Sequence, residues 1–168
     1  MSWLSLVSPF RRREPAVEPA GPRDAAAFAV LHAASFARGW SEQEFEQLLI
    51  ERNALAHRVR LGRSIVGFIV SRCAGDEAEI LSVAVAARHR GRGLAGRLLR
   101  THLGELAGIG VRAVFLEVEE TNRVARQLYA RGGFRDVGRR ANYYRSGHGP
   151  QESGPQGAAA VVMRRDLT

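Results

Sequence analysis

The spacing of apolar positions predicts four amphipathic helices along the chain. Phe28, Leu31 and Phe36 lie at helical spacing in the first, which we expect Asp24 to cap. A serine at 41 followed by a glutamate at 44 forms a capping box, which begins a second helix. A fourth helix, over 122–131, ends at two consecutive glycines. The third helix, over about 93–107, is marked by leucines at 94, 98, 99, 103 and 106.

Shorter apolar stretches rich in β-branched residues predict strands. They cover residues 54–60, 64–73, 79–86, 111–118, 134–144 and 158–164. The stretch 111–118 is almost continuously apolar, as is typical of a strand buried on both faces. Strands and helices alternate through the middle of the chain. This order predicts an α/β domain with a parallel pair of strands at its centre.

Prolines and glycines between residues 15 and 22 separate the first segment of the chain from the rest. We expect residues 1–22 to form a flexible N-terminal tail and residues 23–168 to form one domain, since 168 residues suffice for one domain of ordinary size. The stretch 146–157 is rich in Gly, Pro, Ser and Gln, which predicts a mobile loop.

The charge of the chain is +8, and all 25 basic residues are arginines. The arginine bias fits either a coding preference or a surface for phosphates and acidic partners. Cys73 is the single cysteine, which excludes an intrachain disulfide and fits a reducing cytoplasm. No apolar run approaches the roughly 20 residues of a membrane span, so we expect no stable membrane association. The five histidines lack the spacing of metal ligands, and we interpret them as surface or loop residues, with no metal site: His32, His57, His89, His102 and His148.

A loop rich in glycine and arginine, residues 88–96, joins the strand 79–86 to the third helix. Glycines let backbone N–H groups approach a ligand, and a helix N-terminus attracts anions, so the loop can hold a pyrophosphate. A simple glycine-rich turn is the alternative. A Walker loop is excluded because no Gly-Lys-Ser/Thr follows. The dinucleotide fingerprint stays open, because Glu117 lies at about the distance of its acidic residue.

The motif Arg90-Gly91-Arg92-Gly93-Leu94-Ala95 resembles the Arg/Gln-x-x-Gly-x-Gly/Ala signature of the GNAT superfamily (Gcn5-related N-acetyltransferases). Within it, the chain is similar to the RimI-like ribosomal-protein N-terminal alanine acetyltransferases over roughly residues 24–145. Further matching segments are Phe36, Trp40-Ser41, Val83-Ala84-Val85, Leu116-Glu117-Val118, Asn122, Leu128-Tyr129, Gly133-Phe134 and Asn142-Tyr143-Tyr144.

The resemblance implies a single GNAT-like domain: a mixed, twisted sheet whose central parallel strands splay apart, flanked by helices. It implies acetyl-CoA as the acetyl donor and no metal. The backbone at 83–85 would contact the acetyl carbonyl and pantetheine arm, the loop would hold the pyrophosphate, and Asn122 would bind the pantetheine arm. The residues implied in coenzyme binding are Val83, Ala84, Val85, Arg90, Gly91, Arg92, Gly93, Leu94, Ala95, Gly96 and Asn122.

The resemblance also implies a catalytic pair. Glu117 would take the proton of the acceptor amine, and Tyr129 would protonate the departing thiolate. Each residue has a structural alternative: Glu117 a solvated position at a strand end, Tyr129 a place in the core, and Asn122 a helix cap.

The acceptor implied by the resemblance is the α-amine of a protein N-terminus, most simply an alanine of a ribosomal protein, with no direct binding of nucleic acid. Glu119 and Glu120 could face such a basic substrate. After Tyr144 the chain departs from the family, because its loop is longer and Gly157 to Ala160 replace an acidic pair. A small-molecule amine acetyltransferase and a non-catalytic acyl-CoA-binding module therefore remain as alternatives.

Overall fold

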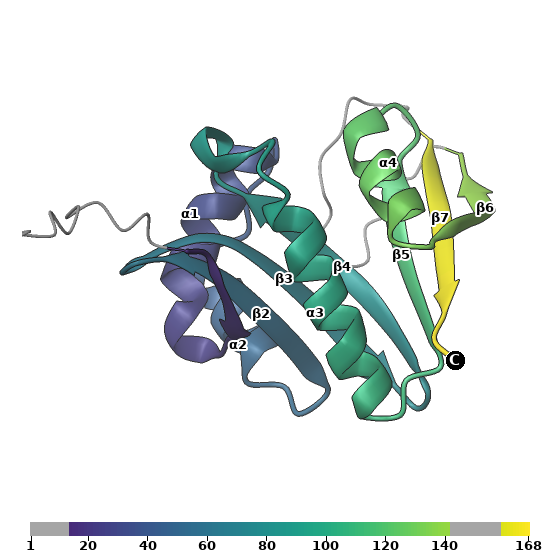
Figure 1. Cartoon of the computed structure of the whole chain (residues 1–168), viewed down its shortest axis with the longest axis horizontal. Helices are drawn as coiled ribbons and strands as arrows, with labels where there is room; N and C mark the ends of the chain where they lie inside the picture. Colours follow the sequence, from purple (N-terminus) through teal and green to yellow (C-terminus); the bar gives the residue numbers. More distant parts are fainter. Residues whose placement is uncertain (1–13, 142–158) are drawn as a thin grey trace, which may run out of the picture.

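The computed structural model describes residues 14–141 and 159–168. Within them, seven strands form one sheet in the order β1-β2-β3-β4-β5-β7-β6 (Figure 1). The strands are β1 (Ala16–Pro19), β2 (Ala54–Leu61), β3 (Ser64–Ala74), β4 (Glu77–Val85), β5 (Ala113–Glu119), β6 (Arg135–Arg140) and β7 (Ala160–Asp166). The helices are α1 (Ala25–Ser35), α2 (Glu42–Leu49), α3 (Leu94–Gly108) and α4 (Arg123–Arg131), with short 3-10 helices η1 (Pro22–Asp24) and η2 (Ala87–His89).

The predicted parallel pair at the centre of the sheet is confirmed as β4 and β5, and the other neighbouring strands are antiparallel. The two parallel strands pair only from Glu77–Ala113 to Ile80–Leu116. Beyond this point they diverge (Figure 1). A β-bulge accounts for the divergence: on β3, Val70 pairs with Ser82 and the next residue pairs with Ile80, so Leu81 is an extra residue on β4. Such a residue bends its strand and raises its twist.

Helices cover both faces of the sheet (Figure 1). α3 and α4 pack on one face, where Leu98, Leu116 and Tyr129 belong to one apolar cluster. α1 and α2 pack on the other face of β2, β3 and the end of β4, where Phe28 stacks on Phe68 with ring centroids 4.4 Å apart. Among the described residues, no helix covers the other halves of β4 and β5, or β7, on this second face.

Two predicted helix starts have different outcomes. The capping box is confirmed: Ser41 N donates to Glu44 Oε2 at 2.7 Å, and Glu44 N donates to Ser41 Oγ at 3.1 Å. Asp24 does precede α1, but its side chain makes no capping bond to that helix. It accepts from Gly21 N at 3.0 Å and forms an ion pair with Arg58 instead. Asp24 therefore fixes the chain that enters α1.

The predicted boundary of the N-terminal tail was wrong for its last residues. Residues 16–19 form strand β1, which pairs with β2 from Ala16–Arg60 to Pro19–His57. Glu18 holds it there through Arg58 and Arg60, at 3.1 and 2.8 Å. The prolines that suggested a tail are compatible with an edge strand, where a missing N–H breaks no ladder. Residues 1–13 and the loop 146–157 lie outside the described residues.

Three of the five histidines are buried, contrary to the sequence-based prediction. His57 and His102 face each other with their Nδ1 atoms 2.9 Å apart, and His102 Nε2 lies 2.7 Å from Ser71 Oγ. His32 Nδ1 accepts from Trp40 N at 3.0 Å. His89 lies in η2 as expected, and His148 lies outside the described residues. Among the described residues, no helix is both long and apolar enough to cross a membrane.

The buried histidines hold their neutral form. Burial, with a smaller effect of the neighbouring His57, lowers the pKa of His102 to about 3. Burial lowers the pKa of His32 to about 4, and it also lowers the pKa of His57. The Nδ1–Nδ1 contact permits only one proton between the two rings, since one nitrogen must donate and the other accept. A second proton would break that hydrogen bond in the core.

We predict that the protein loses stability as the pH falls below about 6.5, the ordinary pKa of histidine. The unfolded chain binds these protons first, so each buried histidine removes up to about 1.4 kcal/mol of unfolding free energy per pH unit. Urea unfolding between pH 8 and pH 4.5 measures this slope. The variant His89→Gln should keep most of it, because His89 lies in the short helix η2 at the surface and not in the core. A flat profile between pH 7 and pH 5 would contradict the prediction.

Candidate active site

The loop between β4 and α3 has the backbone geometry of an anion site. Gly91 and Gly93 have φ values of 75° and 76°, in the left-handed region. A residue with a side chain would be strained in this conformation. At either glycine, a Cβ would have no other atom of the described residues within 4 Å, apart from those of its chain neighbours. The first N–H groups of α3, at residues 94–96, have no partner within the helix. Together with the dipole of α3, they favour a phosphate group at this helix end.

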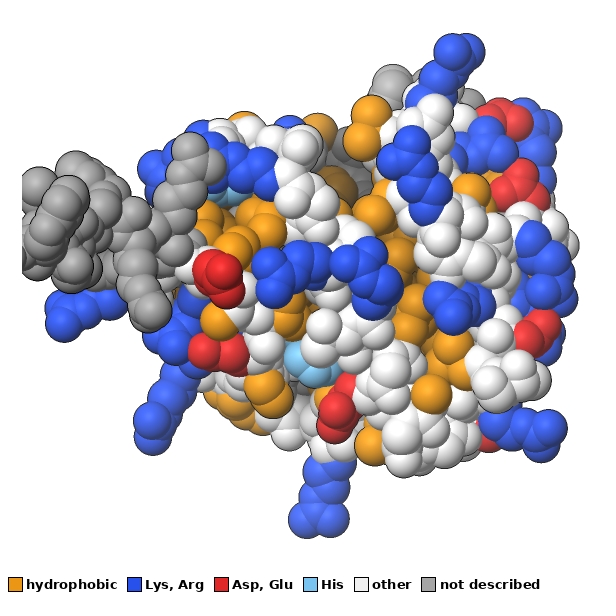
Figure 2. Space-filling view, in the orientation of Figure 1, with side chains coloured by type: hydrophobic (Ala, Val, Ile, Leu, Met, Phe, Trp, Pro, Cys, Tyr) orange, Lys and Arg blue, Asp and Glu red, His pale blue; other side chains and the backbone are white. Residues whose placement is uncertain are grey.

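The arginines of this loop have different surroundings. Arg90 is exposed but is bonded to neighbouring elements: its Nε donates to the carbonyl of Val85 at 3.0 Å, and its Nη2 donates to Ser35 Oγ at 3.2 Å. It therefore fixes the loop to the ends of β4 and α1. Arg88 and Arg92 are exposed beside His89. Basic side chains are spread over the face of the molecule that carries α3, which suits a ligand with several phosphates (Figure 2).

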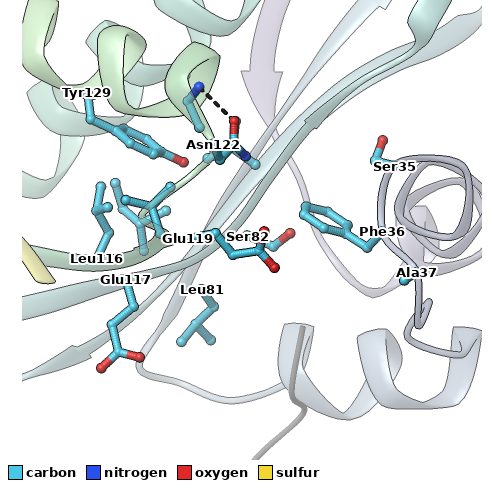
Figure 3. A pocket seen from close by; sticks show the side chains of 14 residues that line it. Ser35, Phe36, Ala37, Leu81, Ser82, Leu116, Glu117, Glu119, Asn122 and Tyr129 are labelled. Atoms are coloured by element: carbon cyan, nitrogen blue, oxygen red, sulfur yellow. Dashed lines mark hydrogen bonds between the residues drawn. The ribbon is translucent and has the colours of Figure 1, made fainter. Parts of the chain in front are cut away.

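A cleft opens where β4 and β5 diverge, with a cavity volume of about 280 Å³. The pairing of β4 with β5 ends at Ile80, so the edge of β4 that carries residues 83–85 faces the cleft, while β3 pairs with its other edge. Phe36 and Ser82 lie across the cleft from Tyr129 (Figure 3). The cleft is lined by Ser35, Phe36, Ala37, Ile80, Leu81, Ser82, Val83, Leu116, Glu117, Val118, Glu119, Asn122, Ala125 and Tyr129.

The two predicted catalytic residues reach this cleft from opposite faces of the sheet. Tyr129 packs in the cluster under α3 and α4, with its ring centroid 5.8 Å from that of Phe134, and its hydroxyl points toward the cleft (Figure 3). Leu116 and Val118 belong to the same cluster, so Glu117 between them projects from the other face. Its carboxylate points away from Tyr129 (Figure 3). Tyr129 thus combines the core position and the cleft position that the sequence offered as alternatives.

Glu117 is nearly buried, with 14% of its side chain exposed. Its Oε1 lies 3.0 Å from Nη1 of Arg140, and its Oε2 is buried without a hydrogen-bond partner among the described residues. A second hollow, of about 340 Å³, opens on this face of the sheet between β4 and β5. Glu79 and Phe115 line it beside Glu117. Burial, and to a lesser degree the neighbouring Glu117, raises the pKa of Glu79.

Asn122 caps a helix. Its Oδ1 accepts from Ala125 N at 3.1 Å at the start of α4 (Figure 3). The amide nitrogen takes no part in this bond, and its use in coenzyme binding stays a prediction. Trp40, which belongs to a segment that resembles the family, is buried against His32 and Phe45, while the matching segment 142–144 lies outside the described residues.

Three site residues were missed by the sequence reasoning: Glu79, Ser82 and Arg140. Ser82 interrupts an apolar strand, and its Oγ is buried without a hydrogen-bond partner among residues 14–141 and 159–168. A polar residue within an apolar run was the available signal. Arg140 gives no such signal, because its role depends on a contact between distant strands. Over the same ranges, no three His, Cys, Asp or Glu side chains are placed to hold a metal ion, and the predicted absence of a metal stays a prediction.

Comparison with known proteins relates this geometry to a family. The family model "Acetyltransferase (GNAT) family" matches residues 25–134. The Mycobacterium tuberculosis N-alpha-acetyltransferase RimI is 34% identical over 131 residues, 76% of this chain and 75% of that protein. The [ribosomal protein bS18]-alanine N-acetyltransferase of Haemophilus ducreyi is 31% identical over 100 residues, 60% of this chain; the match spans 65% of that protein, less than two thirds of its length.

A solved structure shares the architecture. The crystal structure of the ribosomal-protein-S18-alanine N-acetyltransferase from Escherichia coli superimposes with a TM-score of 0.81 and 24% identity, over 92% of this chain and 95% of that one. The matched residues 25–134 include both diverging parallel strands and the glycine loop before α3. The chain belongs to the acetyltransferase (GNAT) family.

Proposed function

We propose that the protein transfers the acetyl group of acetyl-CoA to the α-amine at the N-terminus of a protein, most simply an alanine of a ribosomal protein. The observation that carries this proposal is the cleft between β4 and β5. The glycine loop adjoins it, because Arg90 of that loop donates to Ser35, which lines the cleft, and Tyr129 and Glu117 reach the cleft from opposite faces of the sheet. The names of the Haemophilus ducreyi and Mycobacterium tuberculosis relatives support the choice of an N-terminal acceptor. A cytoplasmic location fits a ribosomal substrate.

The described residues fit a coenzyme A donor. Backbone N–H groups at 91–96 can bind the pyrophosphate, and the exposed Arg92 at the rim can add charge. The edge of β4 at 83–85 offers backbone groups to an extended amide chain, as when a strand is added to a sheet. The pantetheine arm is such a chain, with two amides of its own. The donor would thus complete the backbone pairing that β4 lacks toward β5.

In the proposed reaction, Glu117 acts from one face of the sheet and Tyr129 acts from the other. The amine nitrogen forms a bond to the thioester carbon while the bond from that carbon to sulfur breaks. The carboxylate of Glu117 takes the amine proton through water, and the hydroxyl of Tyr129 gives a proton to the leaving sulfur. Backbone N–H groups at 83–85 stabilise the negative charge on the carbonyl oxygen. With the base on one face and the acid on the other, the nucleophile and the leaving group are on opposite sides of the reacting carbon.

An α-amine suits a carboxylate base. Its pKa is about 7.7–8.0, whereas a lysine amine titrates near 10.4, so a fraction of an α-amine is already neutral at pH 7. The hollow on the face where the amine would approach is lined by Glu77, Glu79 and Glu117 beside Arg72 and Arg140. Its carboxylates outnumber its arginines, in contrast to the chain as a whole, whose net charge is +8.

Acetyl-CoA is expected to raise the melting temperature of the protein. At a concentration 100 times its dissociation constant, the ligand adds about 2.7 kcal/mol to the unfolding free energy, roughly 5–10 °C for a chain of this size. The variant Gly93→Asp should remove this shift, because it places a strained side chain and a negative charge at the phosphate site. Thermal scanning of both proteins tests the prediction. An unchanged melting temperature of the unsubstituted protein at saturation contradicts coenzyme binding.

Glu117→Gln and Tyr129→Phe should slow acetyl transfer while coenzyme affinity persists. Loss of a general base or acid costs on the order of a hundredfold or more in turnover. Tyr129→Phe keeps the ring and its contact with Phe134, so its melting temperature should stay near that of the unsubstituted protein. Steady-state rates at pH 7 and calorimetric binding of acetyl-CoA separate the two effects. Either residue loses its assigned role if its variant turns over at the unsubstituted rate.

A peptide beginning with alanine should be acetylated in preference to the same peptide blocked at its α-amine and carrying a lysine. Polyamines and aminoglycosides should compete poorly. Mass spectrometry of a mixture containing equal concentrations of these acceptors measures the preference. Preferential acetylation of the small amines would instead support the small-molecule alternative, and acetylation of lysine side chains would exclude an N-terminal specificity.

A further inference from the structure

We infer that Arg140 is a positioning residue for Glu117, holding one oxygen of the carboxylate so that the other is presented to the acceptor amine. The inference rests on the proposed function, in which Glu117 receives the amine proton. Arg140 ends strand β6, and β7 lies between that strand and β5. Its guanidinium therefore reaches across a neighbouring strand to contact Glu117.

The contact fixes one oxygen of the carboxylate and leaves the other available. Nη1 of Arg140 lies 3.0 Å from Oε1 of Glu117. Oε2 is buried and has no hydrogen-bond partner among the described residues. An unpaired buried oxygen lowers stability, so it is expected where a ligand or water supplies the donor. Oε2 is therefore the oxygen that can receive a proton from the amine or from the intervening water.

The exposures of the two side chains differ sharply. The side chain of Glu117 is 14% exposed, and that of Arg140 is 63% exposed. An ion pair with one partner this exposed contributes little to stability. The strand fixes the backbone of Glu117, and the contact with the guanidinium sets the direction of its carboxylate. The contact between Arg140 and Glu117 is therefore better suited to orienting the carboxylate than to attaching β6 to the sheet.

Two other arginines near this face already have partners. Arg72 of β3 pairs with Glu51 at 2.9 Å, and Arg164 of β7 pairs with Asp166 at 2.8 Å while lying over the ring of Phe115. Within residues 14–141 and 159–168, the other charged groups that line the cleft and the second hollow are acids: Glu77 and Glu79 of β4 and Glu119 of β5. Without Arg140, Glu117 would face these carboxylates without its cation.

Removal of Arg140 would leave the carboxylate of Glu117 among like charges. A nearby positive charge favours the charged form of a carboxylate, and nearby like charges disfavour it. Without Arg140, Glu117 would lie beside Glu79 with no cation in contact among the described residues. The acidic limb of the activity profile should therefore move to higher pH, an effect that mere loosening of a strand would not produce.

The chain offers a closely matched control in the preceding residue. Arg139 of β6 pairs with Glu120 at 2.9 Å, so Arg139→Gln removes one positive charge and one ion pair from the same strand without touching Glu117. We would measure kcat/KM from pH 5.5 to pH 9 for Arg140→Gln, Arg140→Lys and Arg139→Gln. Arg140→Gln should shift the acidic limb upward by about one pH unit, a roughly tenfold loss on that limb. Arg140→Lys should restore most of it, and Arg139→Gln should match the unsubstituted protein.

Two results would overturn the inference. One is an Arg140→Gln profile that matches that of Arg139→Gln. The other is a loss that is equal at every pH and accompanied by a lower melting temperature, which would make Arg140 a structural residue. Glu117→Gln, measured in parallel, separates this inference from the proposed function: unsubstituted activity in that variant refutes the role of Glu117 itself. If Arg140 acts through Glu117, the double variant should be no slower than Glu117→Gln alone.

Discussion

The separation of β4 from β5 beyond Ile80 is the constraint on which the site depends. One extra residue, Leu81, bends β4 away while β3 keeps its pairing with the other edge. The inner edge of β4 is thereby left with backbone groups that need partners. Unpaired buried backbone groups are unfavourable, so the fold tolerates this gap only where water or a ligand can enter. The cleft is the result, and its chemistry follows from the side chains that face it.

The same separation assigns the two catalytic candidates to different faces. Alternation along β5 sends Leu116 and Val118 into the core under α3 and α4, so Glu117 must project from the opposite face. Tyr129 comes from α4, on the core side. Neither residue needs to contact the other. The phenol is surrounded by an apolar cluster and the carboxylate by a charged hollow, and each environment suits the proton transfer proposed for that group.

The local parts of this architecture could be predicted from the sequence, and the long-range parts could not. The capping box and the glycine loop follow from spacing and composition over a few residues, and the central parallel pair follows from the alternation of strands and helices along the chain. The pairing of β1 depends on Glu18 meeting Arg58 and Arg60 some 40 residues away. Likewise, the contact of Arg140 with Glu117 depends on the order of strands in the sheet, and no short pattern reveals which arginine will arrive there.

The buried pair of histidines makes two chemically identical side chains inequivalent. Because one Nδ1 must donate to the other, His57 and His102 are held in different tautomers at neutral pH. His102 belongs to α3, the helix whose first turn forms the anion site, and His57 belongs to β2 in the sheet. Any displacement of α3 relative to the sheet would change the distance between the two rings. Their ring nitrogens thus provide a built-in spectroscopic reporter, readable by nitrogen NMR, of how the helix responds when its N-terminus is occupied.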